Sequence, residues 1–302
     1  MSNSIFVKDG TAQGVAKQRL IESIAEPSKR VINDPYASSF VIGAGFVKFM
    51  GHKLNVWLSQ KLAPGFHEHL IARTRFIDEL VEKNSYKGFS QYVILGAGYD
   101  SRAHRLELQP SLKIFEVDQP EVSDIKLSKL PKELPNSENV TYVNVDFSHQ
   151  SLSEQLTVAG FDRTKPTLFT LEGVSQYITK EAVSSTINEL ASLVEGTSSI
   201  FFMSYVDENL DKNPSACFGK GYPNPAKKAS LIMSLSEKVG EPWISFYSKE
   251  EIENLLSQNG FSIEEDVTLE DLNSIYFGPV GRTLAENQIF KLEHFLVAIL
   301  KK

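Results

Sequence analysis

The part of the sequence that most constrains the fold is the stretch from Tyr92 to Asp118. A short apolar run, YVIL, leads into Gly96-Ala97-Gly98, and a second apolar run, IFEV, ends on Asp118. This order predicts a strand, a glycine turn, a helix and a second strand that ends in an acid. Glycines let the backbone turn tightly and approach a ligand closely, and amides at a helix start attract anionic groups. An acid about 20 residues further on has the spacing of a ribose ligand.

The stretch therefore predicts a pocket for a nucleoside with a negatively charged tail, and a βα turn without ligand is the alternative. A dinucleotide site would need a third glycine where this chain has Ser101. Asp100 would also repel a pyrophosphate, whereas it suits a ligand that carries an ammonium and a sulfonium group. These features favour S-adenosylmethionine over NAD as the cofactor.

Composition limits the remaining function classes. The chain has 302 residues, a net charge of −7 and one cysteine. The negative charge argues against a nucleic-acid-binding surface, and the single Cys217 excludes an intramolecular disulfide and a cysteine-cluster zinc site. We expect a cytoplasmic protein, because a lone cysteine suits a reducing compartment and no signal peptide opens the chain. The longest apolar run is too short to span a membrane, so no membrane partner is expected.

The first part of the chain, residues 1–88, predicts helices. Ala16, Leu20 and their neighbours at four-residue spacing form an amphipathic helix that ends before Pro27. The sequence Asn33-Asp34-Pro35-Tyr36 predicts a turn. Gly43-Ala44-Gly45 resembles the later glycine turn, but no acid follows at the required distance. We interpret it as a place of close helix packing.

A helix expected over residues 68–83 contains a buried arginine. Arg73 falls on the apolar stripe of this helix, while Arg75 falls on the opposite face. A buried arginine costs several kcal/mol unless it is paired, so Arg73 forms either an internal salt bridge or a clamp for a ligand carboxylate. At the start of this helix, His67-Glu68-His69 could suggest a metal site, but the two histidines lack the i, i+4 spacing of metal ligands on a helix. We interpret those three residues as a solvated face and expect no metal.

The rest of the chain, residues 89–302, alternates between strands and helices. Strands are expected over 91–95, 113–117, 140–143, 167–171, 199–206, 261–268 and 293–300. Thr179 is the expected N-cap of one helix, and Ser248 with Glu251 forms a capping box for another. The pattern predicts an α/β fold with a doubly wound, mainly parallel sheet. The domain expectation is one domain, 1–302, with a helical cap region over 1–88 and an α/β core over 89–302.

Polar residues follow several of the expected strands at the edge where such sheets bind ligands. Asp146 beside Phe147 could meet an adenine ring, although Asp146 could also be a helix N-cap. Glu172 ends a buried strand and could meet an ammonium group. The segment Asp207–Pro225 is too irregular for regular structure and is either a lid or a plain surface loop; we expect a lid insertion over 207–245.

Four motifs in the same order resemble the leucine carboxyl methyltransferase family, which includes the methylase of the protein phosphatase 2A C-terminal leucine and bacterial O-methyltransferases linked to polyketides. They are ARTRFIDEL (72–80), LGAGYDSRAHRL (95–106), FEVDQPEV (115–122) and LEGVSQYI (171–178). The resemblance implies a seven-stranded, Rossmann-like methyltransferase sheet with an antiparallel last strand and a helical N-terminal cap.

The resemblance also implies roles for individual residues. Arg73 would hold the cofactor carboxylate, and Glu172 would face the amino end of the methionine. The implied cofactor-binding set is Arg73, Gly96, Ala97, Gly98, Asp118, Asp146, Phe147 and Glu172. A lysine near the start of the family's chains also binds the cofactor; here Lys17 matches, with Arg19 as the competing assignment.

The expected activity is O-methylation of a carboxylate or hydroxyl on a small molecule or a peptide C-terminus. A carboxylate nucleophile is ionised at pH 7 and needs no general base, whereas a hydroxyl would need one, and His104, Tyr177 and Tyr205 are the candidates. Two other functions stay open: a non-catalytic S-adenosylmethionine sensor or partner-binding module, and an NAD-dependent dehydrogenase. Neither the methyl acceptor nor the oligomeric state follows from the sequence.

Overall fold

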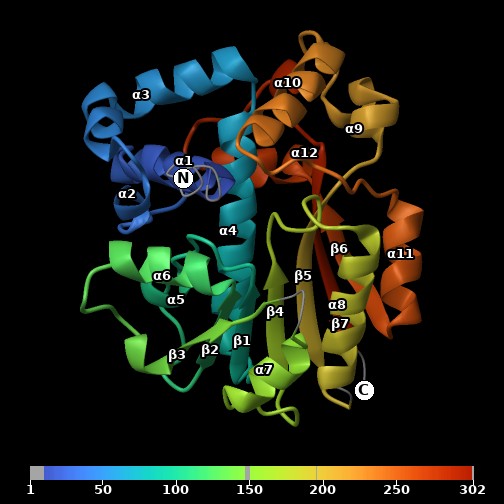
Figure 1. The fold of residues 1–302 in the computed structure, drawn as a ribbon. Coiled ribbons are helices and arrows are strands. Elements are labelled where there is room, and N and C mark those ends of the chain that lie inside the picture. The colour runs from blue at the N-terminus through green and yellow to red at the C-terminus, as the bar shows by residue number, and fades with distance from the viewer. Residues whose placement is uncertain (1–9, 147–149, 195, 301–302) are drawn as a thin grey trace, which may run out of the picture. The chain divides into compact units, whose positions relative to one another are not determined.

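The computed structural model describes residues 10–146, 150–194 and 196–300. Within them the chain forms two compact units (Figure 1). Unit 1 comprises residues 10–77, Val206–Trp243 and Val267–His294, and unit 2 comprises Asp78–Tyr205, Ile244–Asp266 and 295–300.

Unit 1 is built from helices, and the helices predicted for the first part of the chain are present in its described residues 10–77. Its elements are α1 (Gly10–Ser23), η1 (Pro27–Lys29), α2 (Ala37–Phe40), α3 (Ala44–Leu62), the first part of α4 (Phe66–Ser85), α9 (Asn209–Lys212), η3 (Pro214–Cys217), α10 (Pro225–Lys238), α12 (Leu269–Leu272), η4 (Asn273–Phe277) and η5 (Glu286–Gln288). The predicted turn before α2 is confirmed: a carboxylate oxygen of Asp34 accepts hydrogen bonds from the backbone N–H groups of Tyr36 and Ala37.

A seven-stranded sheet with flanking helices forms unit 2, apart from a few residues at strand ends. The strands are β1 (Gln91–Leu95), β2 (Lys113–Asp118), β3 (Val140–Asn144), β4 (Thr167–Leu171), β5 (Ser199–Val206), β6 (Phe261–Val267) and β7 (Glu293–Leu300). Their order is β3-β2-β1-β4-β5-β7-β6. The four pairs from β3 to β5 are parallel, with Leu95 opposite Val117 on one side and Leu171 on the other. The predicted α/β class and strand positions are confirmed.

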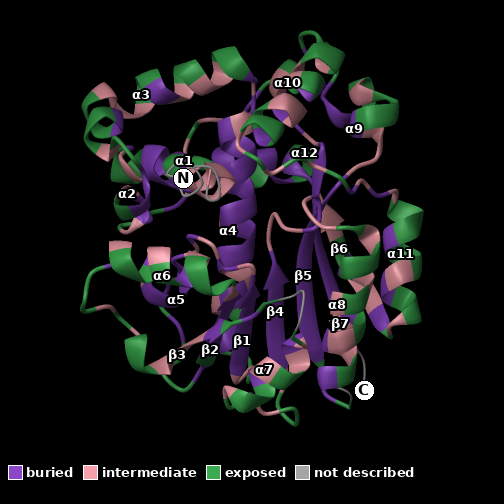
Figure 2. Cartoon of the chain, viewed as in Figure 1, coloured by how far each residue is buried: buried purple, intermediate pink, exposed green. Residues whose placement is uncertain are grey.

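The helices of unit 2 are α5 (Arg102–Arg105), α6 (Pro120–Lys129), η2 (Ser137–Asn139), α7 (Leu152–Val158), α8 (Lys180–Leu193) and α11 (Lys249–Gln258). One face of the sheet forms the main core with α7, α8 and α11, where residues such as Val93, Leu171 and Ile187 are buried together (Figure 2). Successive strand residues point to opposite faces, so Glu116 lies on the other face. There its carboxylate accepts from Lys126 of α6 at 2.5 Å, which places α6 on that face.

Two helix starts in unit 2 follow the sequence rules. The hydroxyl of Thr179 accepts from the backbone N–H of Ala182 at the start of α8. Ser248 and Glu251 form the expected reciprocal capping box at the start of α11. Local hydrogen bonding is enough to fix such ends, so both predictions are confirmed.

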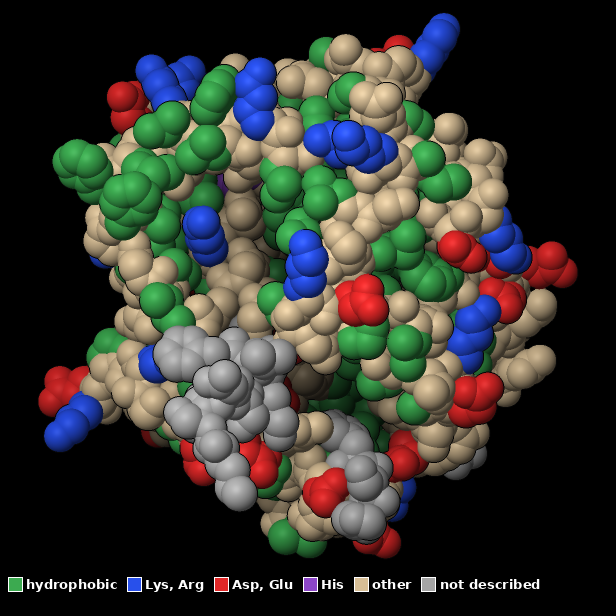
Figure 3. Space-filling model, turned by 45° about the horizontal axis from the view of Figure 1, so that its top comes forward, with side chains coloured by type: hydrophobic (Ala, Val, Ile, Leu, Met, Phe, Trp, Pro, Cys, Tyr) green, Lys and Arg blue, Asp and Glu red, His purple; other side chains and the backbone are tan. Residues whose placement is uncertain are grey.

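Helix α3 packs less closely than predicted. The interpretation of Gly43-Ala44-Gly45 as close helix packing is wrong, because a Cβ at Gly43 or Gly45 would meet nothing within 4 Å. Gly43 instead starts α3 with φ +74°, a conformation that glycine adopts at little cost. Hydrophobic side chains gather on the surface drawn in Figure 3. The large hydrophobic residues exposed along α3 are Phe46, Phe49, Leu54, Trp57, Leu58 and Leu62.

The segment Asp207–Pro225 is more regular than predicted. It contains α9 and η3, and its apolar side chains Leu210, Cys217, Phe218 and Tyr222 are buried. The hydroxyl of Tyr222 donates to the carbonyl of Pro64 at 2.7 Å. The expectation of no regular structure is wrong, because proline also starts a helical turn well, as Pro214 does here.

Within the described residues, every helix is too short or too polar to cross a membrane.

Candidate functional site

The glycine turn after β1 has the predicted geometry. Gly96 and Gly98 both have positive φ, +65° and +44°. A Cβ on Gly96 would lie 2.7 Å from Cγ2 of Val174, so this position needs glycine for space as well as for conformation. The helix after the turn, α5, is only one turn long and begins without a side-chain cap. Its dipole is therefore weaker than the sequence analysis assumed.

Asp118 ends β2 beside this turn. Its Oδ2 accepts the N–H of Gly98 at 2.6 Å, and its Oδ1 accepts the N–H of Gln119 at 2.7 Å. Burial raises the pKa of Asp118, and these two backbone hydrogen bonds oppose the rise. The carboxylate is thus tied to the glycine turn by a hydrogen bond.

Arg102 organises the site, and the sequence analysis did not identify it. Its Nη1 contacts Asp100 Oδ2 and, at 2.6 Å, Glu172 Oε2, and its Nε donates to Asp78 Oδ1 at 2.8 Å. Arg105 pairs with the same Asp78 at 2.7 Å. The sequence did contain a signal for this residue: Arg102 comes two positions after Asp100, directly behind the glycine turn. Residues this close in sequence at a turn can contact each other through their side chains.

The cluster keeps a negative charge. Burial lowers the pKa of Arg102, but the carboxylates of Asp100, Glu172 and Asp78 outweigh this and hold it well above its usual value. Among these five side chains, three carboxylates face two guanidinium groups, so one negative charge is in excess. The predicted meeting of Glu172 with an ammonium group thus has the right electrostatic sign, although in this structure Arg102 contacts that carboxylate.

The cluster also lies where an open α/β sheet binds ligands. In the sheet, β1 has β2 and then β3 on one side and β4 and then β5 on the other, so the order of the strands reverses at β1. This reversal of strand order is a switch point, and ligands bind at the carboxyl ends of the strands there. The glycine turn follows β1 and Glu172 follows β4, so both flank the switch point.

Arg73 is buried in α4, as predicted. Its Nη1 donates to Glu293 Oε1 at 2.8 Å and Oε2 at 2.9 Å, and His69 Nε2 lies 2.7 Å from the same carboxylate. Both sequence hypotheses for Arg73 required a carboxylate partner. Glu293 supplies one within unit 1, and the cofactor clamp stays a prediction.

Of the two basic residues proposed near the chain start, Arg19 is buried and its Nε pairs with Asp34 at 2.8 Å. Lys17, on the same helix, is exposed. Arg19 thus has a buried carboxylate partner, as Arg73 has, and the choice between Lys17 and Arg19 stays a prediction. Of the adenine pair, Asp146 is exposed and its N–H donates to Gln150 at 2.8 Å, while Phe147 lies outside the described residues.

The general-base candidates lie in different surroundings. His104 has both ring nitrogens engaged, by the carbonyl of Pro135 at 2.9 Å and the hydroxyl of Tyr142 at 3.0 Å, and burial lowers its pKa. Tyr205 is buried and donates to Asp266 at 3.0 Å. Tyr177 is half-buried in the loop after β4 that also carries Glu172. Tyr177 is therefore the candidate that shares a loop with the site.

The interpretation of His67-Glu68-His69 as a solvated face is wrong. All three side chains are buried, His67 completely. The expectation came from spacing within one helix, but α4 is buried on most of its circumference in unit 1. Spacing along one helix therefore does not exclude a metal ion near these residues.

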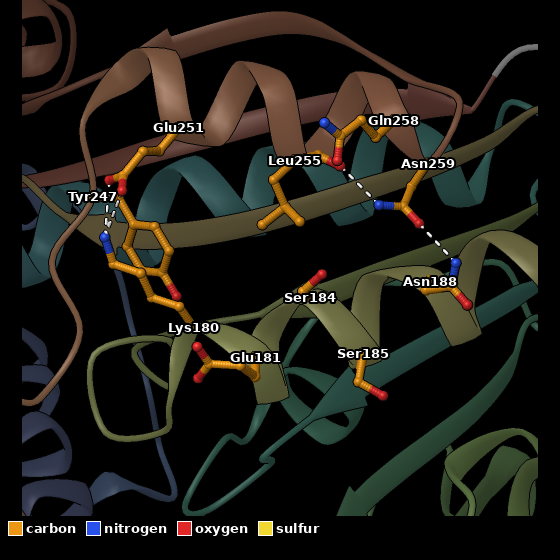
Figure 4. Close-up of a pocket in the computed structure, with 10 residues that line it drawn as sticks. All are labelled: Lys180, Glu181, Ser184, Ser185, Asn188, Tyr247, Glu251, Leu255, Gln258 and Asn259. Carbon is orange, nitrogen blue, oxygen red and sulfur yellow. Dashed lines mark hydrogen bonds and ion pairs between the residues drawn. The ribbon is translucent and has the colours of Figure 1, made fainter.

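A groove of about 750 Å³ lies elsewhere in unit 2, between α8 and α11 (Figure 4). Polar side chains dominate its lining, and Lys180 pairs there with Glu251 at 2.8 Å and lies 4.9 Å above the ring of Tyr247. None of the predicted cofactor residues lines it. The site at the switch point is therefore a different place.

The sequence matches known proteins over most of its length. Residues 12–191 match the family model of leucine carboxyl methyltransferases. "Putative S-adenosyl-L-methionine-dependent methyltransferase YktD" of Bacillus subtilis is 33% identical over 252 residues, which cover 82% of this chain and 77% of that protein. A similarly named protein of Rhodococcus jostii is 36% identical over 186 residues, which cover 60% of this chain and 62% of that protein.

Solved structures match in fold. A DUF574 family protein from Streptomyces avermitilis has a TM-score of 0.57 at 14% identity, covering 93% of this chain and 95% of that chain. A structure titled as a putative methyltransferase from Thermobifida fusca has a TM-score of 0.55 at 17% identity, covering 93% and 96%. At these identities the likeness concerns the fold alone.

Proposed function

The chain belongs to the leucine carboxyl methyltransferase family, and from this we propose that it transfers the methyl group of S-adenosylmethionine to an oxygen atom. The acceptor is a carboxylate or hydroxyl of a small molecule or of a peptide C-terminus. We place this activity in the cytoplasm, since the single cysteine suits a reducing compartment.

One observation carries the proposal: the glycine turn, Asp118 and the Asp100–Arg102–Glu172 cluster surround the carboxyl ends of β1, β2 and β4. This arrangement combines a close backbone approach, a ribose acceptor and an excess of negative charge. A nucleoside with a cationic sulfonium and ammonium group fits such a site, whereas a pyrophosphate would be repelled by it. The same negative charge counts against an NAD-dependent dehydrogenase, because NAD contains a pyrophosphate.

Each predicted residue has a role in this proposal. Gly96, Ala97 and Gly98 lie under the methionine part of the cofactor, and Asp118 accepts from the ribose hydroxyls. Glu172 faces the methionine ammonium, and Asp146 is assigned to the adenine; its predicted partner Phe147 lies outside the described residues. Arg73, with help from Lys17 or Arg19, holds the methionine carboxylate.

The residues mainly align the reactants and exclude water. When bound, the cofactor would supply a methyl group on a sulfonium sulfur: an oxygen of the acceptor would bond to the methyl carbon while the carbon–sulfur bond breaks and S-adenosylhomocysteine leaves. Good alignment alone lowers the barrier by about 7–11 kcal/mol. A carboxylate acceptor is already ionised at pH 7 and needs no base, which suits a site whose buried His104 is engaged on both nitrogens. A hydroxyl acceptor would need a general base, and Tyr177, in the same loop as Glu172, is the candidate for it.

The competing function is a non-catalytic sensor of S-adenosylmethionine. Calorimetric titration with S-adenosylmethionine, S-adenosylhomocysteine and NAD tests the binding site: we expect binding of the adenosyl compounds alone. Incubation with radiolabelled cofactor and a panel of carboxylic and hydroxylated acceptors then separates the functions. Release of adenosylhomocysteine in step with base-labile ester formation supports carboxyl methylation, whereas tight binding without turnover on any acceptor would favour the sensor.

A further inference from the structure

Three side chains from three separate helices of unit 1 meet in the interior. Glu22 comes from α1, His52 from α3 and His67 from α4, and one ligand atom of each lies within 4.8 Å of the other two. Glu22 and His67 are completely buried, and the His52 side chain is 16% exposed. On the face drawn in Figure 3, histidine shows only as a trace of purple. We propose that these three residues bind a divalent transition-metal ion such as Zn²⁺.

The distances suit a small tetrahedral ion. Glu22 Oε2 lies 3.0 Å from His67 Nε2 and 3.5 Å from His52 Nε2. Ligands about 2.0–2.1 Å from a tetrahedral zinc are about 3.3 Å from each other, so Glu22 already has nearly the required separation from each histidine. Two imidazoles and one carboxylate are also a zinc-binding set.

A hydrogen bond orients His67 toward such an ion. Its Nδ1 lies 2.9 Å from Oε1 of Gln18, an oxygen that only accepts, so Nδ1 carries the proton. In the neutral ring the lone pair is then on Nε2 and points at the Glu22 carboxylate, which is itself an acceptor. Two acceptors that face each other at 3.0 Å need a proton or a cation between them. A partner that fixes the tautomer in this way is typical of metal-binding histidines.

The chain is bent to bring His52 into place. Gly51, directly before it, has φ +73° and ψ 168° and breaks α3, although a Cβ there would meet nothing within 4 Å. The buried amide of Asn55 bridges the break by donating to the carbonyls of Val47 and Gly51. Among the described residues, Nε2 of His52 is buried and lacks a hydrogen-bond partner. Such a nitrogen aimed at a carboxylate is suited to ligation.

The charge of the cluster limits the affinity. Glu22 Oε1 accepts from Arg282 Nη1 at 2.7 Å and from the N–H of Val31 at 2.6 Å, which leaves Oε2 to face the histidines. The ion pair with Arg282 at 2.7 Å favours the ionised carboxylate that a metal ligand must be. Because Arg282 already balances that charge, we expect a dissociation constant on the order of 1 µM, weaker than that of a four-ligand structural zinc site.

Such an ion would fasten α1, α3 and α4 to each other. The site is part of unit 1 and shares no residue with the proposed cofactor site. Its role would therefore be structural, and the inference stands or falls independently of the proposed methyl transfer.

The test begins with the full chain, stripped with a chelator, and Zn²⁺ as the probe. Calorimetry should show one equivalent bound, and the melting temperature should rise with Zn²⁺. His52→Gln removes the least buried of the three ligands and should weaken binding at least about 100-fold, and Gln18→Leu should weaken it by about 10- to 100-fold. His104→Gln alters a buried histidine outside the cluster and should leave the affinity unchanged.

A measurement on the unaltered protein makes the result independent of how the variants fold. With ¹⁵N-labelled histidine, Zn²⁺ should shift the Nε2 resonances of His52 and His67 and leave those of His104 in place. No binding would show that a proton holds the cluster together, and equal binding by the protein and the His52→Gln variant would place the ion elsewhere. Either result overturns the proposal.

Discussion

Arg73 and Glu293 form a buried ion pair within unit 1, in which one guanidinium nitrogen contacts both carboxylate oxygens at 2.8 and 2.9 Å. The two residues are 220 positions apart in the sequence. The pair bears directly on whether Arg73 supports the fold, the cofactor or both.

Replacing Arg73 by methionine separates these roles. Loss of the guanidinium leaves the buried Glu293 with less compensation, so the free energy of unfolding should fall by about 3–5 kcal/mol. If Arg73 also clamps the cofactor, affinity should fall by about 2–5 kcal/mol in addition. Both quantities come from urea denaturation and calorimetry.

A second substitution and a control sharpen this test. Adding Glu293→Gln should restore much of the stability, because it removes the unpaired charge, without restoring cofactor affinity. Arg75→Met lies on the half-exposed side of the same helix and should change either quantity by at most about 1 kcal/mol. Normal affinity in a refolded Arg73→Met/Glu293→Gln protein would end the clamp hypothesis.

Asp118 should matter for binding more than for folding. Asp118→Asn keeps an acceptor for the Gly98 N–H but loses the charge-assisted bonds to the ribose. These are worth about 1.5–3 kcal/mol, so affinity for S-adenosylhomocysteine should fall roughly tenfold to a hundredfold. Thermal melting should change little. An unchanged dissociation constant would remove Asp118 from the cofactor site.

Gly96 is expected to be required for space as well as for conformation. Gly96→Ala places a Cβ 2.7 Å from Val174 at a positive φ, so cofactor binding should be lost and stability should fall by about 2–3 kcal/mol. Gly88→Ala is the matched control, since Gly88 has φ +91° but open space around it; it should cost only about 1–2 kcal/mol. Equal effects of both substitutions would mean that backbone strain alone matters.

Arg102→Met should destabilise the protein in a pH-dependent way. The substitution removes the guanidinium that contacts Asp78, Asp100 and Glu172 and keeps the contact of Arg105 with Asp78, so the loss of stability at pH 8 should be about 3–5 kcal/mol. The pKa of Arg102 is raised, so its charge contributes stability at every pH below its usual range. Acidification protonates the carboxylates of Asp78, Asp100 and Glu172 in the variant. The difference in the free energy of unfolding between the variant and the unaltered protein should therefore shrink toward pH 4. Urea denaturation at both pH values measures it, and a pH-independent difference would contradict this account.

Cys217 reports on whether the 207–245 segment opens as a lid. Burial raises the pKa of its thiol to about 12, so the folded protein should react with a thiol reagent at pH 8 only after this segment opens. If the segment is a lid, labelling should be faster than global unfolding and S-adenosylhomocysteine should slow it. Labelling at the rate of global unfolding, with or without ligand, would show a packed surface loop. The chain has one cysteine, so the signal has a single source.

The sequence by itself determined the features that depend on local patterns. Strands β1, β4 and β5 lie where the apolar runs place them, since buried parallel strands need continuous apolar side chains. Helix starts at Thr179 and Ser248 follow from hydrogen bonds within one turn. The glycine turn and the acid at the end of β2 could likewise be predicted, because they lie close together in the sequence.

The tertiary structure alone decided which charged residues meet. Arg102 joins Asp78, Asp100 and Glu172 across α4, α5 and two strand ends, and Glu22, His52 and His67 come together from three helices. Spacing along one helix made His67-Glu68-His69 look solvated, whereas the packing of unit 1 buries them. Periodicity reports only which face of an element is apolar, and the partner of a buried charge is fixed by the elements that pack against that face.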